Sequence, residues 1–219
     1  MAIKGLIFDL DGTVTLTQQF HAQAFIEVFK NHGLTYTAAD DARFSGRGAH
    51  CTFPEFFKEH GITITEEQTQ QYSAEKAVVY DRIIQNAPIE AVPGVAKFLE
   101  TQKAKGMKFA MGTGNRIEAT DFLLKKVGLR EYFPFIITNK DVENSKPAPD
   151  IFLKAVEKLG LKPEECIVFE DAVNGVQAAK AGHMHCIALI TTTPKEKLQA
   201  AGADYLVNNY DEVTNEMLK

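Results

Sequence analysis

The sequence predicts an α/β protein: a doubly wound parallel sheet of the Rossmann-like type, interrupted by an inserted helical segment. Short runs of successive apolar residues, rich in β-branched and aromatic side chains, alternate with amphipathic stretches along most of the chain. Strands that are apolar on both faces are typical of a parallel sheet covered by helices on both sides. From about residue 15 to residue 90 this alternation stops, and only helical patterns occur.

Six apolar runs are expected to form the strands. In chain order they are IKGLIFDLD, KFAMGTG, PFIITN, CIVFED, HCIALIT and, more weakly, DYLVNN. Helical patterns lie between them at residues 95–105, 116–127, 150–159 and 174–181. The last three patterns end at Gly128, Gly160 and Gly182, and a glycine is a common signal for the end of a helix. Helices that alternate with strands in this way connect parallel neighbours.

The inserted segment contains two strong helix patterns. FHAQAFIEVFKNHG places five apolar side chains on one helical face, namely Phe20, Ala24, Phe25, Val28 and Phe29. TEEQTQQYSAEKAVVYDRIIQN begins with a capping-box pattern from Thr65 to Gln68. The insert is too long for an ordinary loop. We therefore expect an α/β core domain of residues 1–14 and 91–219, and an inserted helical cap domain of residues 15–90.

The composition limits the class of partner. Hydrophobic residues make up 45% of the 219 and charged residues 24%, as in globular domains. The net charge is −5 and no basic run occurs. This argues against nucleic acid or a membrane as partner, but permits a small anionic substrate. Cys51, Cys166 and Cys186 are scattered and no leader-like segment is evident, so we expect free thiols in a reducing cytoplasm.

Residues that offer polar side chains or backbone N–H groups follow four of the predicted strands, at the sheet edge where parallel α/β proteins bind ligands. In chain order they are Asp9 and Asp11, then Thr113, Gly114 and Asn115, then Lys146, and finally Glu170 and Asp171. Taken singly, each has a structural explanation, such as an Asp-Gly turn or a helix cap. Two carboxylates at the end of an apolar run are unfavourable, however, unless a cation or a proton lies between them. Together these residues predict a metal and phosphate site.

The chemistry of these groups suggests their roles. Mg²⁺ prefers hard oxygen ligands, which Asp9, Asp171 and the backbone carbonyl of Asp11 could supply. An aspartate can attack phosphorus, and a second carboxylate can protonate the leaving oxygen and then activate water. Lys146 would neutralise the transferring oxygens. The remaining donors to phosphate are the Thr113 hydroxyl and the backbone N–H groups of Gly114 and Asn115.

Four segments resemble, in order and spacing, the signature motifs of the haloacid dehalogenase superfamily: DLDGT, TGN, KPAPD and FEDAVNGVQAAKAG. The resemblance covers the whole chain, and a helical insert directly after the first motif resembles the β-phosphoglucomutase-like phosphatase branch. It implies that Asp9 is the nucleophile, that Asp11 is the general acid and base, and that Thr113 and Lys146 bind phosphate. The implied Mg²⁺ ligands are Asp9, the Asp11 carbonyl and Asp171, with Glu170 either in the metal shell or paired with Lys146.

The same resemblance implies substrate contacts from the insert. In TQQFH, Thr17 and His21 stand at the spacing found in that branch. A surface histidine on a helix explains His21 equally well. ARFSGRGAH resembles the loop through which the cap of that branch contacts substrate, and Arg47 is the contact we favour within it. The mutase of that branch has a lysine where this chain has Ser45. Because a mutase must hold a bisphosphate in two orientations, this departure favours a phosphatase.

We therefore expect a cytoplasmic, Mg²⁺-dependent phosphatase that hydrolyses a small phosphorylated metabolite through an aspartyl-phosphate, under a mobile cap. Phosphotransfer of the β-phosphoglucomutase type is the first alternative. A phospho-aspartate signalling receiver is a remote one, because a receiver is shorter and its phosphorylated Asp follows a middle strand. No GxGxxG or P-loop pattern follows a strand, which excludes a dinucleotide-binding oxidoreductase. One chain suffices to build the site, so we expect a monomer. The sequence does not distinguish sugar phosphates, nucleotides and phosphorylated acids as substrates.

Overall fold

The computed structural model describes residues 2–44 and 48–219 and divides the chain into two compact units. The sheet unit contains residues 1–16 and 89–219, and the helical unit contains residues 17–88. Where the chain leaves and re-enters the sheet unit, the Leu16 N–H donates to the Glu90 carbonyl and the Val92 N–H to the Val14 carbonyl, both at 2.9 Å. This pairing keeps both segments with the sheet, so each junction lies two residues further into the insert than expected.

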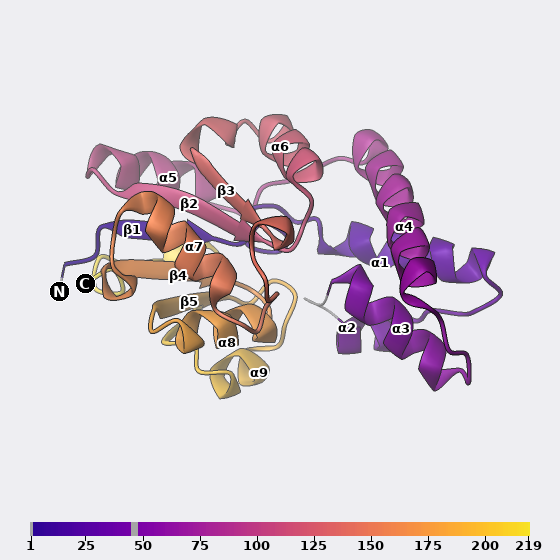
Figure 1. The fold of residues 1–219 in the computed structure, drawn as a ribbon. Helices are drawn as coiled ribbons and strands as arrows, with labels where there is room; N and C mark the ends of the chain where they lie inside the picture. The colour runs from indigo at the N-terminus through magenta and orange to yellow at the C-terminus, as the bar shows by residue number, and fades with distance from the viewer. Residues whose placement is uncertain (1, 45–47) are drawn as a thin grey trace. The chain divides into compact units, whose positions relative to one another are not determined.

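The sheet unit is built on six parallel strands in the order β3-β2-β1-β4-β5-β6 (Figure 1). The strands are β1 (Gly5–Phe8), β2 (Lys108–Thr113), β3 (Phe135–Thr138), β4 (Cys166–Glu170), β5 (His185–Leu189) and β6 (Tyr205–Val207). Each lies in one of the predicted apolar runs. The order reverses between β1 and β4, and open α/β sheets bind ligands at the carboxyl ends of strands at such a reversal. The predicted doubly wound fold is confirmed.

Helices cover both faces of this sheet (Figure 1). They are α5 (Val95–Ala104), α6 (Ile117–Lys126), α7 (Asp150–Leu159), α8 (Val173–Ala181) and α9 (Lys195–Ala200), with 3₁₀ turns η1 (Arg130–Tyr132), η2 (Asn139–Asp141), η3 (Pro163–Glu165) and η4 (Tyr210–Glu212). Successive strand residues point to opposite faces. Ile7 therefore joins one core together with Ile151 of α7, whereas Phe8 stacks on Phe169 at 4.8 Å and meets Phe98 of α5 on the other face.

The helical unit contains α1 (Gln18–Asn31), α2 (Ala38–Phe44), α3 (Ala49–Glu59) and α4 (Glu66–Asn86), and its described residues form no strand. Its core is aromatic: the ring centroid of Phe29 lies 4.2 Å from that of Phe56 and 5.1 Å from that of Phe53. The apolar face predicted for α1 is buried in this core. The predicted capping box is present, because the Gln68 N–H donates to the Thr65 hydroxyl at 3.1 Å and the Thr65 N–H donates to the Gln68 side chain at 2.8 Å.

The cysteines are free thiols. Cys166 in β4 and Cys186 in β5 are fully buried and pack as small apolar side chains. Burial raises the pKa of the Cys166 thiol to about 12, with the nearby Glu165 and Glu164 carboxylates adding to the rise. Neither buried thiol is therefore suited to act as a nucleophile at neutral pH.

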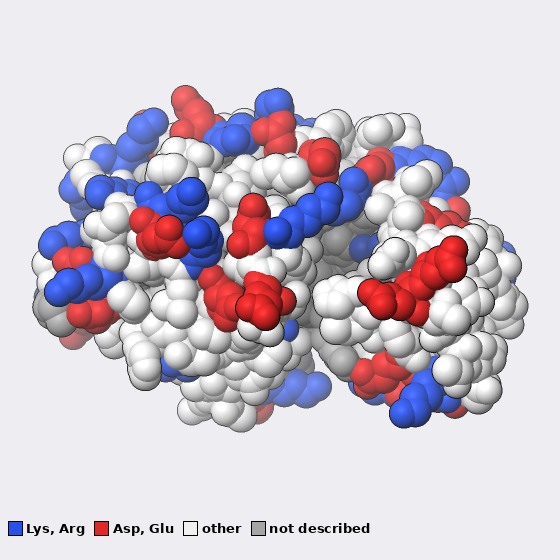
Figure 2. Space-filling view, viewed as in Figure 1, with Lys and Arg blue, Asp and Glu red and all other residues white. Residues whose placement is uncertain are grey.

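The surface carries both signs of charge. On the face shown in Figure 2, acidic and basic side chains are interspersed over each unit. Among residues 2–44 and 48–219, none of the helices combines the length and the apolar composition that crossing a membrane requires.

Candidate active site

The side chains predicted to carry the chemistry meet at the carboxyl ends of the central strands. Asp9 follows β1 directly, Thr113 is the last residue of β2, and Glu170 is the last residue of β4. Lys146 comes from the segment between β3 and α7, and its Nζ lies 2.6 Å from Asp9 Oδ1. Because parallel strands end at the same edge of a sheet, residues more than one hundred positions apart meet there.

Lys146 is buried between two carboxylates. Its Nζ donates to Asp9 Oδ1 at 2.6 Å and to Glu170 Oε1 at 2.7 Å, and the three side chains are 9%, 11% and 2% exposed, respectively. The ammonium also lies 4.7 Å from the ring centroid of Phe152 in α7. Burial acts to lower the pKa of Lys146, but the Asp9 and Glu170 carboxylates outweigh it and raise that pKa. The lysine therefore stays protonated at neutral pH.

Burial disfavours the ionised form of Asp9. Burial raises the pKa of Asp9 to about 7; the Lys146 ammonium opposes this rise, and the Glu170 and Asp11 carboxylates add to it. Asp9, Glu170 and Asp171 are all buried, and one buried ammonium faces the first two of them. The carboxyl groups thus outnumber the ammonium, which disfavours the ionised form of Asp9, and any further positive charge beside Asp9 would favour that form.

Glu170 uses both of its carboxylate oxygens. Oε1 accepts from Lys146, and Oε2 accepts from the backbone N–H groups of Asp171 and Ala172 at 2.8 Å each, just before α8 begins. The carboxylate occupies the space beside Gly175, where a Cβ would stand 1.8 Å from Oε1. Of the two possibilities left open for Glu170, the structure therefore favours the pair with Lys146 over a place among the metal ligands.

Each carboxylate oxygen of Asp171 accepts a hydrogen bond from a threonine hydroxyl. The Thr13 hydroxyl donates to Oδ1 at 3.2 Å, and the Thr192 hydroxyl donates to Oδ2. The carboxylate lies against Gly12, whose φ is +82° and whose Cβ, if it had one, would stand 2.1 Å from Oδ2. Burial raises the pKa of Asp171 well above its usual range, and the Glu170 and Asp9 carboxylates raise it further.

The TGN segment joins the turn after β1. The Asn115 N–H donates to the Thr113 hydroxyl at 3.1 Å, and the Asn115 side-chain amide donates to Asp11 Oδ2 at 3.2 Å. The helix that follows, α6, begins at Ile117, one residue after the start of the predicted pattern, and Gly114 and Asn115 lie in the turn before it. The reason is local: the Asn115 side-chain oxygen accepts the N–H of the next residue and ends the turn there.

The donor set fits a hard divalent cation. Buried, oxygen-only ligands with excess negative charge are what Mg²⁺ prefers, and Mg²⁺ commonly takes one or two carboxylates while it keeps several waters. In the described ranges, no group of three or more His, Cys, Asp or Glu side chains is arranged so that it could hold a metal ion by itself. An open site with Asp9 and Asp171 on neighbouring strand ends is consistent with the smaller number of protein ligands that Mg²⁺ needs.

The predicted substrate contacts lie in the helical unit. Thr17 is buried at the start of α1. His21 stacks on the ring of Tyr80, with centroids 4.0 Å apart, and its Nδ1 lies 2.6 Å from Lys76 Nζ. His21 is therefore part of a packed cluster rather than an isolated surface histidine. Arg47 lies outside the described residues.

Sequence reasoning missed two side chains in particular. Lys76 occurs within a long amphipathic helix, where a lysine carries no signal of its contact with a residue 55 positions away. Thr192 follows HCIALIT, the run that forms β5. Its position after a strand is the one signal that the sequence offers for it, because the residues after β5 reach the same edge of the sheet.

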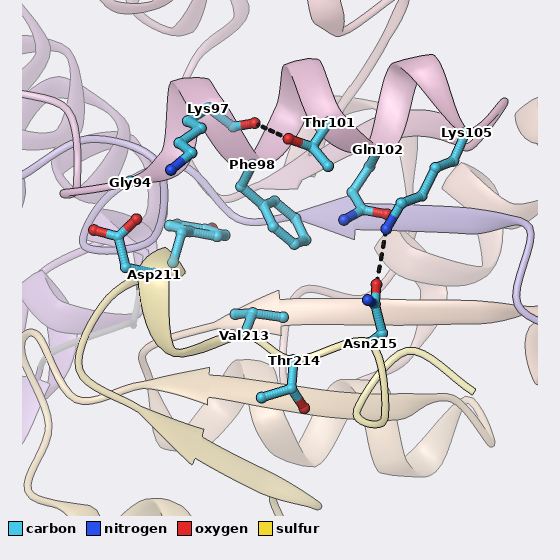
Figure 3. Close-up of a pocket in the computed structure, with 11 residues that line it drawn as sticks. Gly94, Lys97, Phe98, Thr101, Gln102, Lys105, Asp211, Val213, Thr214 and Asn215 are labelled. Atoms are coloured by element: carbon cyan, nitrogen blue, oxygen red, sulfur yellow. Dashed lines mark hydrogen bonds between the residues drawn. The ribbon is translucent and has the colours of Figure 1, made fainter.

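A separate groove of about 410 Å³ lies between α5 and the C-terminal segment (Figure 3). The Lys105 Nζ of α5 donates to Asn215 Oδ1 at 2.8 Å, which links the two segments. None of the residues predicted for the site lines this groove. We therefore place the candidate active site at the buried carboxylates of Asp9, Glu170 and Asp171.

Comparison with known proteins agrees with this placement. A model of a hydrolase family, the haloacid dehalogenase-like hydrolases, matches residues 3–183. The chain belongs to this family. The matched residues include every core position from Asp9 to Asp171, and the predicted family resemblance is confirmed.

Individual relatives span most of the chain. Fructose-1-phosphate phosphatase YqaB of Escherichia coli (strain K12) is 31% identical over 84% of this chain and 94% of its own length. The chloroplastic protein SUPPRESSOR OF QUENCHING 1 of Arabidopsis thaliana is 31% identical over 91% of this chain, which spans 19% of that longer protein. The solved structure of a hydrolase from Pseudomonas syringae has a TM-score of 0.87 at 28% identity and covers 98% of this chain and 97% of its own.

Proposed function

We propose that this chain is a Mg²⁺-dependent phosphatase that hydrolyses a small phosphorylated metabolite through an aspartyl-phosphate on Asp9. One observation carries the proposal: Asp9 is buried at the order reversal of the sheet, in contact with the Lys146 ammonium. A carboxylate held beside a fixed cation is suited to meet a phosphoryl group, whose oxygens need positive charge around them. Membership of a hydrolase family and the phosphatase activity in the name of YqaB support it.

The reaction has two halves. In the first, a carboxylate oxygen of Asp9 bonds to phosphorus, the ester P–O bond breaks, and Asp11 gives its proton to the leaving oxygen. In the second, Asp11 takes a proton from a water molecule, the water oxygen bonds to phosphorus, and the bond to Asp9 breaks to release inorganic phosphate. The hydrogen bond from Asn115 to Asp11 Oδ2 supports this role, because it fixes the acid beside the turn that carries the nucleophile.

The phosphoryl oxygens need hydrogen-bond donors in both halves of the reaction. We assign this role to the Lys146 ammonium, the Thr113 hydroxyl and the backbone N–H groups of Gly114 and Asn115. Lys146 is already oriented by two short hydrogen bonds and needs little rearrangement. Preorganised donors of this kind stabilise the charge that develops during transfer without the cost of reorienting solvent.

The metal shell completes the proposal. We assign it to Asp9, the Asp11 backbone carbonyl and Asp171. Mg²⁺, when bound, would supply the positive charge that polarises the phosphoryl group and keeps Asp9 ionised. Glu170 would act indirectly, since one of its oxygens holds Lys146 and the other holds the turn before α8.

We place the substrate among phosphorylated sugars and similar small metabolites, following the activity in the name of YqaB. A hexose-phosphate mutase remains the alternative, but the position at which it would need an extra cation is Ser45, which lies outside the described residues. A signalling receiver is disfavoured because Asp9 follows the first strand in the chain and a helical unit comes next. All of the proposed core residues come from one chain, so the reaction requires no second copy.

The direct test is phosphate release by the purified protein from sugar phosphates, nucleotides and phosphorylated acids, with Mg²⁺ and with EDTA. We expect Mg²⁺-dependent release, and its loss in Asp9→Asn without a change in the circular dichroism spectrum. The panel includes β-glucose 1-phosphate with a bisphosphate activator, since isomerisation without phosphate loss would establish the mutase instead. Full activity in Asp9→Asn would exclude Asp9 as the nucleophile.

A further inference from the structure

We propose that Tyr210, in the C-terminal part of the chain, is a positioning residue for the turn after β1. Its hydroxyl donates to the Thr13 carbonyl at 3.1 Å, a contact that we term the tyrosine anchor. Thr13 lies two residues after Asp11, and the anchor holds Asp11 where it can protonate the leaving oxygen. This role rests on the proposed function. It adds a residue beyond the segment, residues 3–183, that matches the family model.

Thr13 joins the turn to the rest of the site. Its N–H donates to the Leu10 carbonyl at 3.2 Å, and its hydroxyl donates to Asp171 Oδ1 at 3.2 Å. Among the residues that the structure describes, Tyr210 is the one donor to the Thr13 carbonyl. Because Thr13 is 0% exposed, water has no access with which to replace this donor. A buried carbonyl without a partner is costly, so the turn depends on the anchor.

Packing alone does not explain the hydroxyl of Tyr210. The residue begins η4 and is 3% exposed. Its ring centroid lies 5.2 Å from that of Phe98 in α5 and 5.5 Å from that of Phe169 in β4. A phenylalanine ring would fill this aromatic site without the cost of taking a hydroxyl out of water. The hydrogen bond to Thr13 offsets that cost, so the hydroxyl serves the turn after β1.

The anchor is in place before any substrate binds. The Tyr210 N–H donates to the Pro93 carbonyl at 3.1 Å, which ties the start of η4 to the segment before α5. Burial raises the pKa of Tyr210 well above its usual range, and the Asp171 and Asp9 carboxylates raise it further. The hydroxyl therefore keeps its proton at neutral pH and remains a donor to the turn.

Loss of the anchor should affect proton donation more than phosphate binding. Without its donor, the Thr13 carbonyl has to turn toward another one, and the backbone that rotates with it leads directly to Asp11. Lys146 and Thr113, the proposed phosphate donors, come from other strand ends and keep their own contacts. A displacement of about 1 Å in a catalytic group can lower a rate by about 100-fold. We therefore expect a defect in the acid rather than in the phosphate site.

The test compares two leaving groups. Tyr210→Phe keeps the ring and removes the hydroxyl. We measure kcat/KM with Mg²⁺ for p-nitrophenyl phosphate, whose leaving group departs without a proton, and for the most active sugar phosphate of the release panel, whose leaving oxygen needs one. We expect a loss of roughly 10- to 100-fold for the sugar phosphate and a much smaller loss for p-nitrophenyl phosphate. A merely structural role would lower both values by the same factor, through loss of folded protein.

Tyr36→Phe is the matched control. Tyr36 is 4% exposed, and its ring stacks on Phe29 in the core of the helical unit. Its hydroxyl is buried and has no hydrogen-bond partner among the described residues, so we expect wild-type kcat/KM on both substrates. Hydrogen exchange of residues 9–15, followed by mass spectrometry without substrate, gives a second measurement. We expect faster exchange of this turn in Tyr210→Phe than in Tyr36→Phe or the wild type.

An equal loss of kcat/KM on the two substrates, or no loss on either, would overturn the inference. Should Tyr210→Phe fail to fold, Tyr210→Leu, which also lacks the hydroxyl, decides by the same ratio. A wild-type chain that releases no phosphate from any substrate would refute the proposed function. Hydrogen exchange then decides the anchor separately: faster exchange of the turn in Tyr210→Phe would support it, and unchanged exchange would overturn it as well.

Discussion

The buried ion pairs that Lys146 makes with Asp9 and Glu170 lead to a prediction about both stability and catalysis. Lys146→Met removes the ammonium and keeps most of the side-chain volume beside Phe152. Asp9 and Glu170, which are both buried, then face each other without their shared cation. We expect a large loss of stability in the metal-free protein, together with loss of phosphate release.

The magnitude follows from burial. Removing one partner of a buried ion pair costs about 3–5 kcal/mol, because the charge left behind has no compensation. The pKa of Asp9 is already raised to about 7 by burial, and it rises further without Lys146, so Asp9 can take up a proton and recover part of the loss. We therefore expect a destabilisation of about 3 kcal/mol at pH 8 and a smaller one at pH 6, where Asp9 is largely protonated in the wild type as well.

Urea denaturation of the metal-free protein at both values of pH measures this. The control is Lys154→Met, which breaks a pair of similar length, 2.8 Å to Glu157 Oε2, between side chains that are 37% and 65% exposed. Exposed pairs contribute little to stability, so we expect almost no change in this variant. Equal losses in the two variants, or a loss in Lys146→Met that is larger at pH 6 than at pH 8, would refute the reasoning.

Two further predictions concern the same carboxylates. Because the folded-state pKa of Asp9 lies near 7 and its unfolded value near 3.8, the folded state binds the extra proton, so metal-free stability should fall as pH rises from 5 to 7. Urea titrations should show this slope flatten in Asp9→Asn or when Mg²⁺ is added; a slope of opposite sign would contradict the pKa of Asp9. Gly175→Ala in α8 should destabilise by about 1–3 kcal/mol through overpacking against Glu170, instead of the gain of about 0.5–1 kcal/mol usual for this change in a helix. A more stable Gly175→Ala variant by the same assay would show that Glu170 moves aside freely.

The fold was predictable because its strands carry a strong signal. Runs such as CIVFED are apolar on successive residues, and β4 is buried at every position. That pattern follows from a sheet covered on both faces, so it appears in the sequence before any contact is known. Exact ends were less predictable: α6 begins at Ile117 because the Asn115 side chain ends the preceding turn, a contact made by a single residue.

The site was predictable to the extent that it follows from topology. Parallel strands end at one edge, so residues after β1, β2 and β4 had to meet. The partner of each carboxylate was not predictable in the same way. Glu170 had two plausible roles in the sequence, and the choice between them depends on Gly175 leaving space and on two backbone N–H groups pointing at Oε2. These are packing details that spacing along the chain does not contain.

The charge balance connects the fold to its chemistry. The strand ends that meet at the order reversal carry three buried carboxylates, and burial raises the pKa of both Asp9 and Asp171. A fold selected for stability alone would avoid such an arrangement, since buried like charges oppose folding. Under the proposed function it would become favourable once a divalent cation and a phosphoryl group bind, because the cation would remove the repulsion and leave Asp9 ionised for the attack that we propose. The electrostatic strain of the metal-free site is thus the reason that we expect metal binding, stability and activity to rise together.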